Sequence, residues 1–527
     1  MQSTNDTKIE PQAKKVDADG ASLAYAECAK PGESGQGQGI HYEEANLKRN
    51  LAQRHLMMLV IGGVIGPGYF VGMGTGLSGA GPAGLLICFA IIGLLLWGVM
   101  QSLGELGAFI PVSGSFVHYT ARFIDPAAGF AVGWNYCFLW AGIIMAEYNN
   151  LGLVLGYWDT PIPRWGWILM FWYVLAFPNN LFLGIKSFGE AEFWLALIKV
   201  LSIAAFLLCA ILITTGVIGG EKIGFKFYQD PGAFANGPKG VFEIFVFAAL
   251  QYSGSEMVGL TAGESANPSR DVPKAVKSVI WRIVVIFLGG IFFLTLTVPF
   301  NHPDLLNPKN KTASSPFVIA FTRVGAYAGA HTINAIIVVT ILSAVNSALY
   351  VGSRTLVGLA SQGQAPKILA WTNSRGVPVY SVVIMNLIGF LSLLNLSSGA
   401  GKFYIWVVTM TGVATFITWA CICLAHVRLR QALHQQGVSE DVLPFKANPW
   451  VAWVTFGVNI FFIFFQGWTA FAPWNMEAFL QNYIIVAVFI VFYVGWKFYH
   501  KTPWVQPKMA DLISNRRDLE PVQQATQ

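Results

Sequence analysis

Three charged side chains fall within apolar stretches of this sequence. Glu147 lies in IIMAEYNNLGLVLG, Lys199 in FWLALIKVLSIAAF and Glu256 in LQYSGSEMVGL. A charge at the centre of a bilayer costs roughly 2.5–3.5 kcal/mol on insertion scales. Each of the three therefore belongs either to a satisfied structural pair or to a site for proton coupling, cation coupling or substrate contact. Lys199 is a candidate proton carrier, because burial among apolar groups disfavours the charged form of a lysine.

Three uncharged polar residues interrupt another apolar stretch, AIIVVTILSAVNSALYVGSRTL, over residues 335–356. Ser343, Asn346 and Ser347 are spaced three and four residues apart, so a helix places them on one face. Lipid offers these side chains no hydrogen-bond partner, so the face is expected to point into a helix bundle.

Two apolar stretches contain residues that break helices. The first, LVIGGVIGPGYFVGMGTG, surrounds Pro67 with glycines, and proline removes a backbone donor while glycine weakens a helix. The second, FVFAALQYSGSEMVGLTAGE, has Ser253, Gly254 and Ser255 in its middle. Close packing of small residues is one interpretation. The other is an unwound backbone that faces a ligand, as in transporters whose two halves carry matching broken helices.

The composition is that of an integral membrane protein. The chain has 527 residues, of which 54% are hydrophobic and 11% are charged, whereas soluble domains carry about 25% charged residues. The net charge of +6 is too small for this length to indicate nucleic-acid binding. We find no nucleophile–base motif, metal-ligand cluster or phosphate-binding loop, so we expect no enzyme activity, no metal and no cofactor.

Since a membrane helix needs about 20 mostly apolar residues, the sequence predicts an all-α protein with twelve spans. The spans cover residues 55–78, 82–107, 128–157, 165–184, 191–215, 241–264, 281–300, 332–356, 379–396, 403–427, 450–472 and 481–499. Residues 1–45 are predicted to be a disordered tail, 46–506 the transporter domain and 507–527 a short C-terminal tail. Basic residues favour the loops on one side, which places both termini in the cytoplasm. The two breaks lie in spans one and six, five apart, which suggests two five-helix halves.

Several long segments resemble the fungal amino-acid permeases of the amino acid–polyamine–organocation superfamily. They are GGVIGPGYFVGMGTGLSGAGPAGLL, GSEMVGLTAGESANPSRDVPKAV and SAVNSALYVGSRTLVGLASQGQAPKIL, within a resemblance that runs from about Asn46 to Gln506. The resemblance implies a 5+5 inverted repeat with discontinuous helices 1 and 6, followed by two further helices. It also implies proton-driven amino-acid uptake by alternating access at the plasma membrane.

The resemblance assigns expected roles to the residues at both breaks. It places the substrate α-carboxylate on the backbone of Ile65, Gly66 and Gly68, and the α-amino group near Tyr252, Ser253 and Gly254. Lys199 matches a lysine associated with the coupling position, and Glu147 and Glu256 match family glutamates. We therefore expect Lys199 and Glu147 to take part in proton coupling and Glu256 to contact the substrate. For Ser343, Asn346 and Ser347 two interpretations stay open: hydrogen bonds that hold the unwound first span, or a cation- or proton-linked site shared with Lys199.

Two departures from the family pattern concern the substrate. Pro67 stands where a serine or threonine is usual, and Tyr148, Asn149 and Asn150 replace small residues. These changes leave room for an alternative substrate, such as a polyamine or a choline-like amine. A nutrient sensor with the transporter fold is a further alternative, against which the leading tail of about 45 residues argues. Lysines in that tail resemble ubiquitin acceptors, which implies a ubiquitin ligase as a partner: Lys8, Lys14, Lys15 and Lys30.

Overall fold

The computed structural model describes residues 65–66, 68–112, 114–158, 161–173, 184–262, 265, 267–306, 315–396, 400–471 and 473–516. Within these ranges the regular structure is helical, apart from an isolated bridge between Phe471 and Trp474 and a bridge residue at Ser265. Pro67, the leading tail with its four lysines, and the end of the trailing tail lie outside the described residues. The predicted tail boundaries therefore stay predictions.

Eight helical stretches in the described part of the chain are long and apolar enough to cross a membrane. They are Gly68–Phe109, Pro126–Trp158, Gly189–Thr214, Pro268–Thr297, Tyr327–Ser361, Trp406–Gln435, Pro449–Ala470 and Met476–His500. The predicted first span is joined to the second, the fourth is described only in part, and the sixth and ninth appear as shorter helices. The all-helical membrane architecture is confirmed, whereas the count of twelve and the inverted repeat stay predictions.

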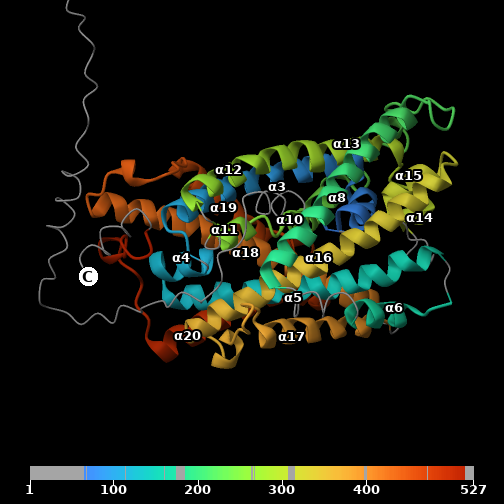
Figure 1. Cartoon of the computed structure of the whole chain (residues 1–527). Helices are drawn as coiled ribbons and strands as arrows, with labels where there is room; N and C mark the ends of the chain where they lie inside the picture. The colour runs from blue at the N-terminus through green and yellow to red at the C-terminus, as the bar shows by residue number, and fades with distance from the viewer. Residues whose placement is uncertain are drawn as a thin grey trace, which may run out of the picture. The chain divides into compact units, whose positions relative to one another are not determined.

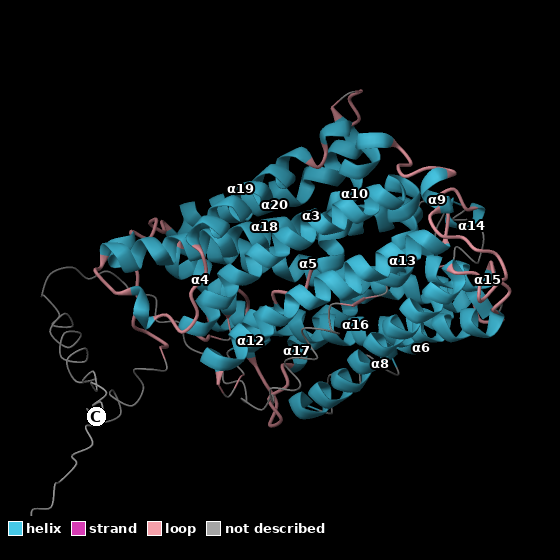
Figure 2. Cartoon of the chain, turned by 90° about the horizontal axis from the view of Figure 1, so that it is seen from above, coloured by secondary structure: helices cyan, strands magenta, loops and turns pink. Residues whose placement is uncertain are grey.

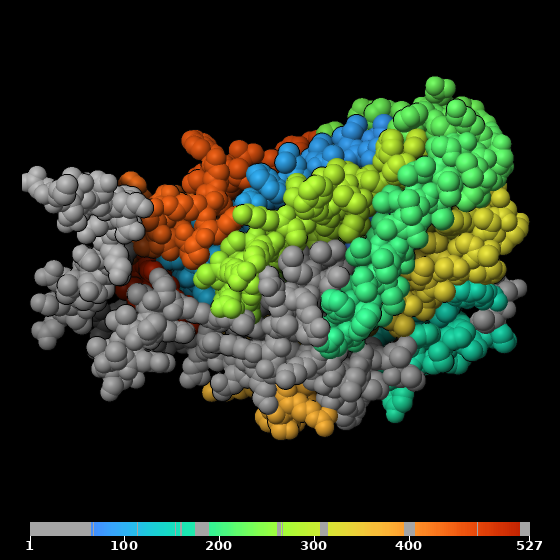
Figure 3. All heavy atoms as spheres, turned by 45° about the horizontal axis from the view of Figure 1, so that its top comes forward, coloured from blue at the N-terminus to red at the C-terminus, as the bar shows by residue number. Residues whose placement is uncertain are grey.

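The long helices pack as a bundle (Figures 1 and 2). Contacts between neighbours are most extensive for α16 with α5, α10 with α3, and α18 with both α19 and α5. Figure 3 shows α3, α12 and α8 on one face. The long helices and their continuations are α3 (Met73–Phe109), α5 (Pro126–Leu155), α8 (Gly184–Thr214), α10 (Gly237–Tyr252), α12 (Pro268–Trp281), η4 (Arg282–Gly289), α13 (Gly290–Thr297), α16 (Tyr327–Ser361), α17 (Val379–Ile388), η6 (Gly389–Leu396), α18 (Ala400–Gln435), α19 (Pro449–Phe465) and α20 (Met476–His500).

Shorter helices connect the long ones. They are η1 (Gly68–Gly72), α4 (Ser115–Phe123), η2 (Gly156–Trp158), α6 (Arg164–Phe171), α9 (Lys226–Gln229), α11 (Met257–Ala262), α14 (Pro303–Leu306), α15 (Pro316–Thr322), η5 (Lys367–Ala370), η7 (Glu440–Val442), η8 (Trp468–Ala470) and η9 (Pro507–Met509). Local sequence explains where several helices begin. Asp125 accepts a hydrogen bond from the Ala127 amide at the start of α5, and Pro126 occupies the first helical position, as is favoured at helix N-termini.

A sharp turn at Gly81 joins the predicted first and second spans without a loop. Gly81 has φ = +77°, a left-handed conformation that glycine adopts without steric cost. A Cβ at this position would also lie 2.6 Å from the Ala235 amide nitrogen. Pro82 follows the turn and lacks a backbone donor, which explains why the helix before Gly81 ends there.

The sixth span is interrupted where the sequence predicts it. Helix α10 ends at Tyr252 and α11 begins at Met257. Between them, Ser253 has an extended ψ of 149° and Gly254 has φ = +89°. Helices commonly end at a glycine in the left-handed conformation, so the position of the break follows from Gly254.

The segment after α20 folds back against the helices. The Val505 amide donates to Ile124 O at 3.0 Å, and Arg122 donates through Nε to Asp511 O at 2.6 Å and pairs with the Asp511 carboxylate at 3.1 Å. Leu512 and Arg516 are buried. The predicted C-terminal tail is therefore in contact with α4 through Asp511 and Ser514.

Candidate functional site

A cavity that opens to solvent lies between the two breaks, and the empty space within and in front of it, open solvent included, is about 700 Å³. Four of the predicted site residues line it: Gly66 and Gly68 from the first break, Glu147 from α5 and Ser253 from the second break. The other lining residues are Gly72, Trp140, Ile143, Ala146, Asn150, Phe247, Leu250, Gln251, Ala344, Val408 and Thr411. Glu147 is the one ionisable side chain among these described lining residues, so the wall has no fixed positive charge to offer a ligand.

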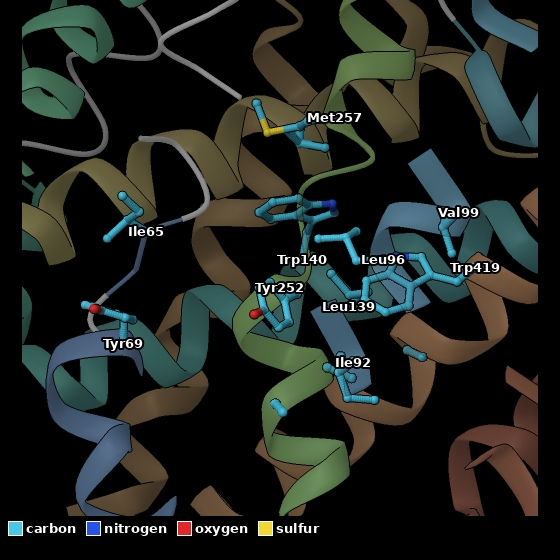
Figure 4. Close-up of a cluster of buried hydrophobic side chains, with 14 of the residues drawn as sticks. Ile65, Tyr69, Ile92, Leu96, Val99, Leu139, Trp140, Tyr252, Met257 and Trp419 are labelled. Atoms are coloured by element: carbon cyan, nitrogen blue, oxygen red, sulfur yellow. The ribbon is translucent and has the colours of Figure 1, made fainter. Parts of the chain in front are cut away.

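The first break leaves backbone groups of Ile65 and Gly66 outside any helix before η1 begins at Gly68. Figure 4 shows Ile65 in this segment and Tyr69 in η1, which follows it. A Cβ at Gly66 would meet Glu147 Oε1 at 3.6 Å, an ordinary contact distance, and would point toward the cavity wall. A Cβ at Gly68 would lie 2.2 Å from Gln251 Oε1. The absence of a side chain at Gly68 therefore lets the Gln251 amide approach the first break.

The second break is held by the carboxylate of Glu256. Glu256 Oε1 accepts from the Gly254 amide at 3.0 Å, and Oε2 accepts from Trp419 Nε1 at 3.2 Å. Glu256 is fully buried and is not among the cavity-lining residues. With both oxygens occupied in this way, Glu256 has the geometry of a residue that stabilises the break.

A buried arginine reinforces the same break. Arg282, in η4, donates to Ser255 Oγ, and Ser255 in turn donates to Tyr252 O at 2.6 Å. Tyr252 itself is fully buried, and its hydroxyl donates to Phe89 O at 3.1 Å. Tyr252 and Gly254 do not line the cavity; Figure 4 shows Tyr252 on α10. The sequence indicates no role for Arg282, because it falls at the edge of a predicted span.

Lys199 contacts the first break. Its Nζ donates to Ile65 O at 3.2 Å and lies 3.6 Å from Glu192 Oε1. Ser343 donates to the same Glu192 oxygen. The predicted polar face of residues 343–347 is therefore buried, as expected, and Ser343 is connected to Lys199 through Glu192. Of the two interpretations, the one that joins the face to Lys199 expects a contact of this kind.

The other two members of that face are placed differently. Asn346 and Ser347 are both buried, with exposed fractions of 6% and 1%. Ser347 Oγ has no hydrogen-bond partner within the described residues. The alternative, in which these residues hold the unwound backbone of the first span over residues 63–66, stays open, because the structure describes only Ile65 and Gly66 of that segment.

Sequence reasoning missed two kinds of site residue. Gln251 lines the cavity with an exposed fraction of 8%, and its position directly before the break was the available signal. Trp140, Phe247 and Val408 line the cavity as well, but apolar residues in a span look alike in sequence. Among the described residues, no group of three or more His, Cys, Asp or Glu side chains could hold a metal ion.

Comparisons of the sequence with known proteins identify a family. The model of the family described as "Amino acid permease" matches residues 55–508. The general amino acid permease AGP3 of Saccharomyces cerevisiae is 41% identical, over 86% of this chain and 81% of that protein. The lysine-specific permease of the same yeast is 39% identical, over 92% and 81% of the two chains.

A solved structure also resembles the chain, with a lower sequence identity than the two permeases. A mutant manganese transporter from Eremococcus coleocola has a TM-score of 0.47 and 15% sequence identity, over 89% of this chain and 96% of that one. The match to the permease model spans most of the sequence and both breaks. The chain is thus a multi-pass membrane protein and belongs to the amino acid permease family.

Proposed function

We propose that this protein takes up amino acids across the plasma membrane together with protons. The observation that carries the proposal is the cavity that joins Gly66 and Gly68 of the first break to Ser253 of the second. Family membership supports an amino acid as the substrate, and the two named yeast relatives are a general and a lysine-specific permease.

The helix ends at the two breaks suit the two charged groups of an amino acid. The helical stretch from Gly68 presents its positive N-terminal end to the cavity, which favours the substrate α-carboxylate near Gly66 and Gly68. Helix α10 ends at Tyr252 and presents its negative C-terminal end, which favours the α-ammonium near Ser253. Glu147, on the cavity wall, adds a second group that an ammonium can contact.

Lys199 and Glu147 are the groups to which we assign proton coupling. Lys199 donates to Ile65 O, so its protonation state affects the backbone next to the carboxylate site. Glu147 Oε2 is buried and has no hydrogen-bond partner within the described residues. An ionised Glu147 close to a bound carboxylate is unfavourable, so a proton on Glu147 favours binding.

The finer architecture and location are part of the same proposal. Twelve spans in a 5+5 inverted repeat with two further helices allow alternating access through movement of the broken helices. Both termini lie in the cytoplasm, and a ubiquitin ligase acts on lysines of the leading tail. The family match and the break in the sixth span support this organisation.

An uptake panel in a fungal strain that lacks its own permeases tests the proposal. We expect uptake of at least one labelled standard amino acid, with faster uptake at acidic external pH. Purified protein in proteoliposomes should give the same uptake when an inward proton gradient is imposed. Uptake of a polyamine or choline, with no uptake of any standard amino acid, would replace the amino-acid proposal by the amine alternative.

A further inference from the structure

A buried ion pair in α8 lies beside the cavity without lining it. Lys199 Nζ is 3.6 Å from Glu192 Oε1, and both side chains are 0% exposed. Burial of two charges is unfavourable unless each is compensated by its partner and by hydrogen bonds. The burial of this ion pair therefore has either a structural reason, such as holding helices together, or a functional one.

The partners of the pair connect three parts of the fold. Glu192 accepts from Ser343 of α16, and Lys199 donates to Ile65 O of the first break. The second oxygen of the carboxylate, Glu192 Oε2, has no hydrogen-bond partner in the described part of the chain. The carboxylate thus keeps unused acceptor capacity beside the lysine, which a purely structural pair would not need.

We propose that Glu192 is the positioning residue that keeps Lys199 protonated until the cavity opens to the cytoplasm. This inference rests on the proposed proton symport. With the ammonium intact, the Glu192–Lys199 pair is neutral. When an N–H bond of the ammonium breaks, the proton passes to water, the electron pair stays on Nζ, and the pair carries one negative charge. A buried net charge is unfavourable, so release is coupled to the arrival of water.

The contact with Ile65 transmits this change to the substrate site. A protonated Lys199 makes a charge-assisted hydrogen bond to Ile65 O, which is stronger than one from a neutral amine. Loss of the proton weakens that bond and loosens the backbone next to Gly66. Ser343 fixes the orientation of the Glu192 carboxylate from the opposite side.

The other elements packed against α8 place few ionisable groups near the pair. Glu147 of α5 also interacts electrostatically with Lys199. Helix α13 carries no ionisable side chain, and in η4 the one such residue, Arg282, is bonded to Ser255. From α16 the contact to the pair is the hydroxyl of Ser343. Glu192 is therefore the carboxylate in direct contact with Lys199 among the described residues.

The test compares Glu192→Gln with Glu190→Gln in proteoliposomes. Glu190 is a half-buried carboxylate two residues earlier in α8, so its variant is the matched control. The lumen contains a pH-sensitive dye, and the added probe is an equimolar mixture of the twenty standard amino acids. Counterflow of the same labelled mixture measures exchange, which needs no net proton movement.

We expect Glu192→Gln to keep counterflow but to move half-maximal proton-coupled uptake by about one to three pH units toward acid. This is the range by which an opposite charge within 4–6 Å changes protonation. Glu190→Gln should match the wild type in both assays. The inference is overturned if Glu192→Gln retains the wild-type pH profile and the wild-type number of protons per substrate.

The double variant Glu192→Gln/Lys199→Met covers the case in which Glu192→Gln fails to fold. Removal of both charges leaves no uncompensated ion, so the double variant should fold. We expect it to catalyse counterflow without acidifying the lumen, and acidification by it would overturn the inference. Absence of proton-linked uptake by the wild type would instead contradict the proposed function itself, so the two failures are distinguishable.

Discussion

Substitution of Gly66 by valine is expected to weaken substrate binding strongly while the protein remains folded. Gly66 lies outside the left-handed region, so an L side chain there is not strained by the backbone. A Cβ would meet Glu147 Oε1 at 3.6 Å, and no described side chain lies at a shorter distance. The new side chain therefore fits the fold but occupies the place proposed for the α-carboxylate.

The expected loss follows from the hydrogen bonds that the carboxylate can no longer make. Each charge-assisted bond contributes roughly 1.5–3 kcal/mol, so the loss of two weakens binding by about 3–6 kcal/mol. Since 1.4 kcal/mol is a factor of ten, the dissociation constant should rise by at least about 100-fold. Gly66→Ala should give a smaller rise, because one methyl group fills less of the cavity.

Two measurements check this prediction. The concentration dependence of uptake reports KM, and isothermal titration of the detergent-purified protein reports affinity directly. Thermal unfolding of the same preparations shows whether the variant is folded. A folded Gly66→Val protein with the wild-type affinity would refute the placement of the carboxylate at the first break.

Three further predictions concern stability. A Cβ at Gly290 would lie 1.7 Å from the Tyr69 hydroxyl, which donates to Ile286 O at 2.7 Å; Gly290→Ala should therefore destabilise by about 1–3 kcal/mol. Thermal unfolding checks this, and added Tyr69→Phe should restore part of the loss. Trp419→Phe removes a buried donor to Glu256, so it should cost roughly 1.5–3 kcal/mol; an unchanged melting temperature would contradict the role of Glu256 in the break. Burial and the neighbouring Arg122 lower the pKa of His118 from 6.5 to about 3. Because a lowered pKa gives stability that is lost as the pH falls from the unfolded to the folded value, hydrogen-exchange protection of the Val505 amide should decline between about pH 6.5 and 3. His118→Gln should weaken that pH dependence, and equal sensitivity in both proteins would show that His118 is not its source.

Many features of this protein follow from local sequence. Long apolar stretches specify membrane helices, because the backbone in lipid must satisfy its own hydrogen bonds. Gly254 between two serines predicts the break in the sixth span, and the structure ends α10 beside it. The burial of Glu147, Lys199 and Ser343 was predicted as well, because charged and polar groups at membrane depth must face the protein interior.

The partners of these residues were decided by tertiary structure. The sequence predicts Glu256 as a substrate-binding residue, but it gives no sign that the carboxylate accepts from Trp419, 163 positions later in the chain. Ser343 reaches Lys199 through Glu192, which lies 151 positions earlier than Ser343. Composition and spacing predict which side chains are buried, because a polar residue within a long apolar stretch lies at membrane depth and must face the protein interior. Which buried side chain meets which depends on how distant helices pack, so the assignment of Glu192, Gln251 and Arg282 required the folded chain.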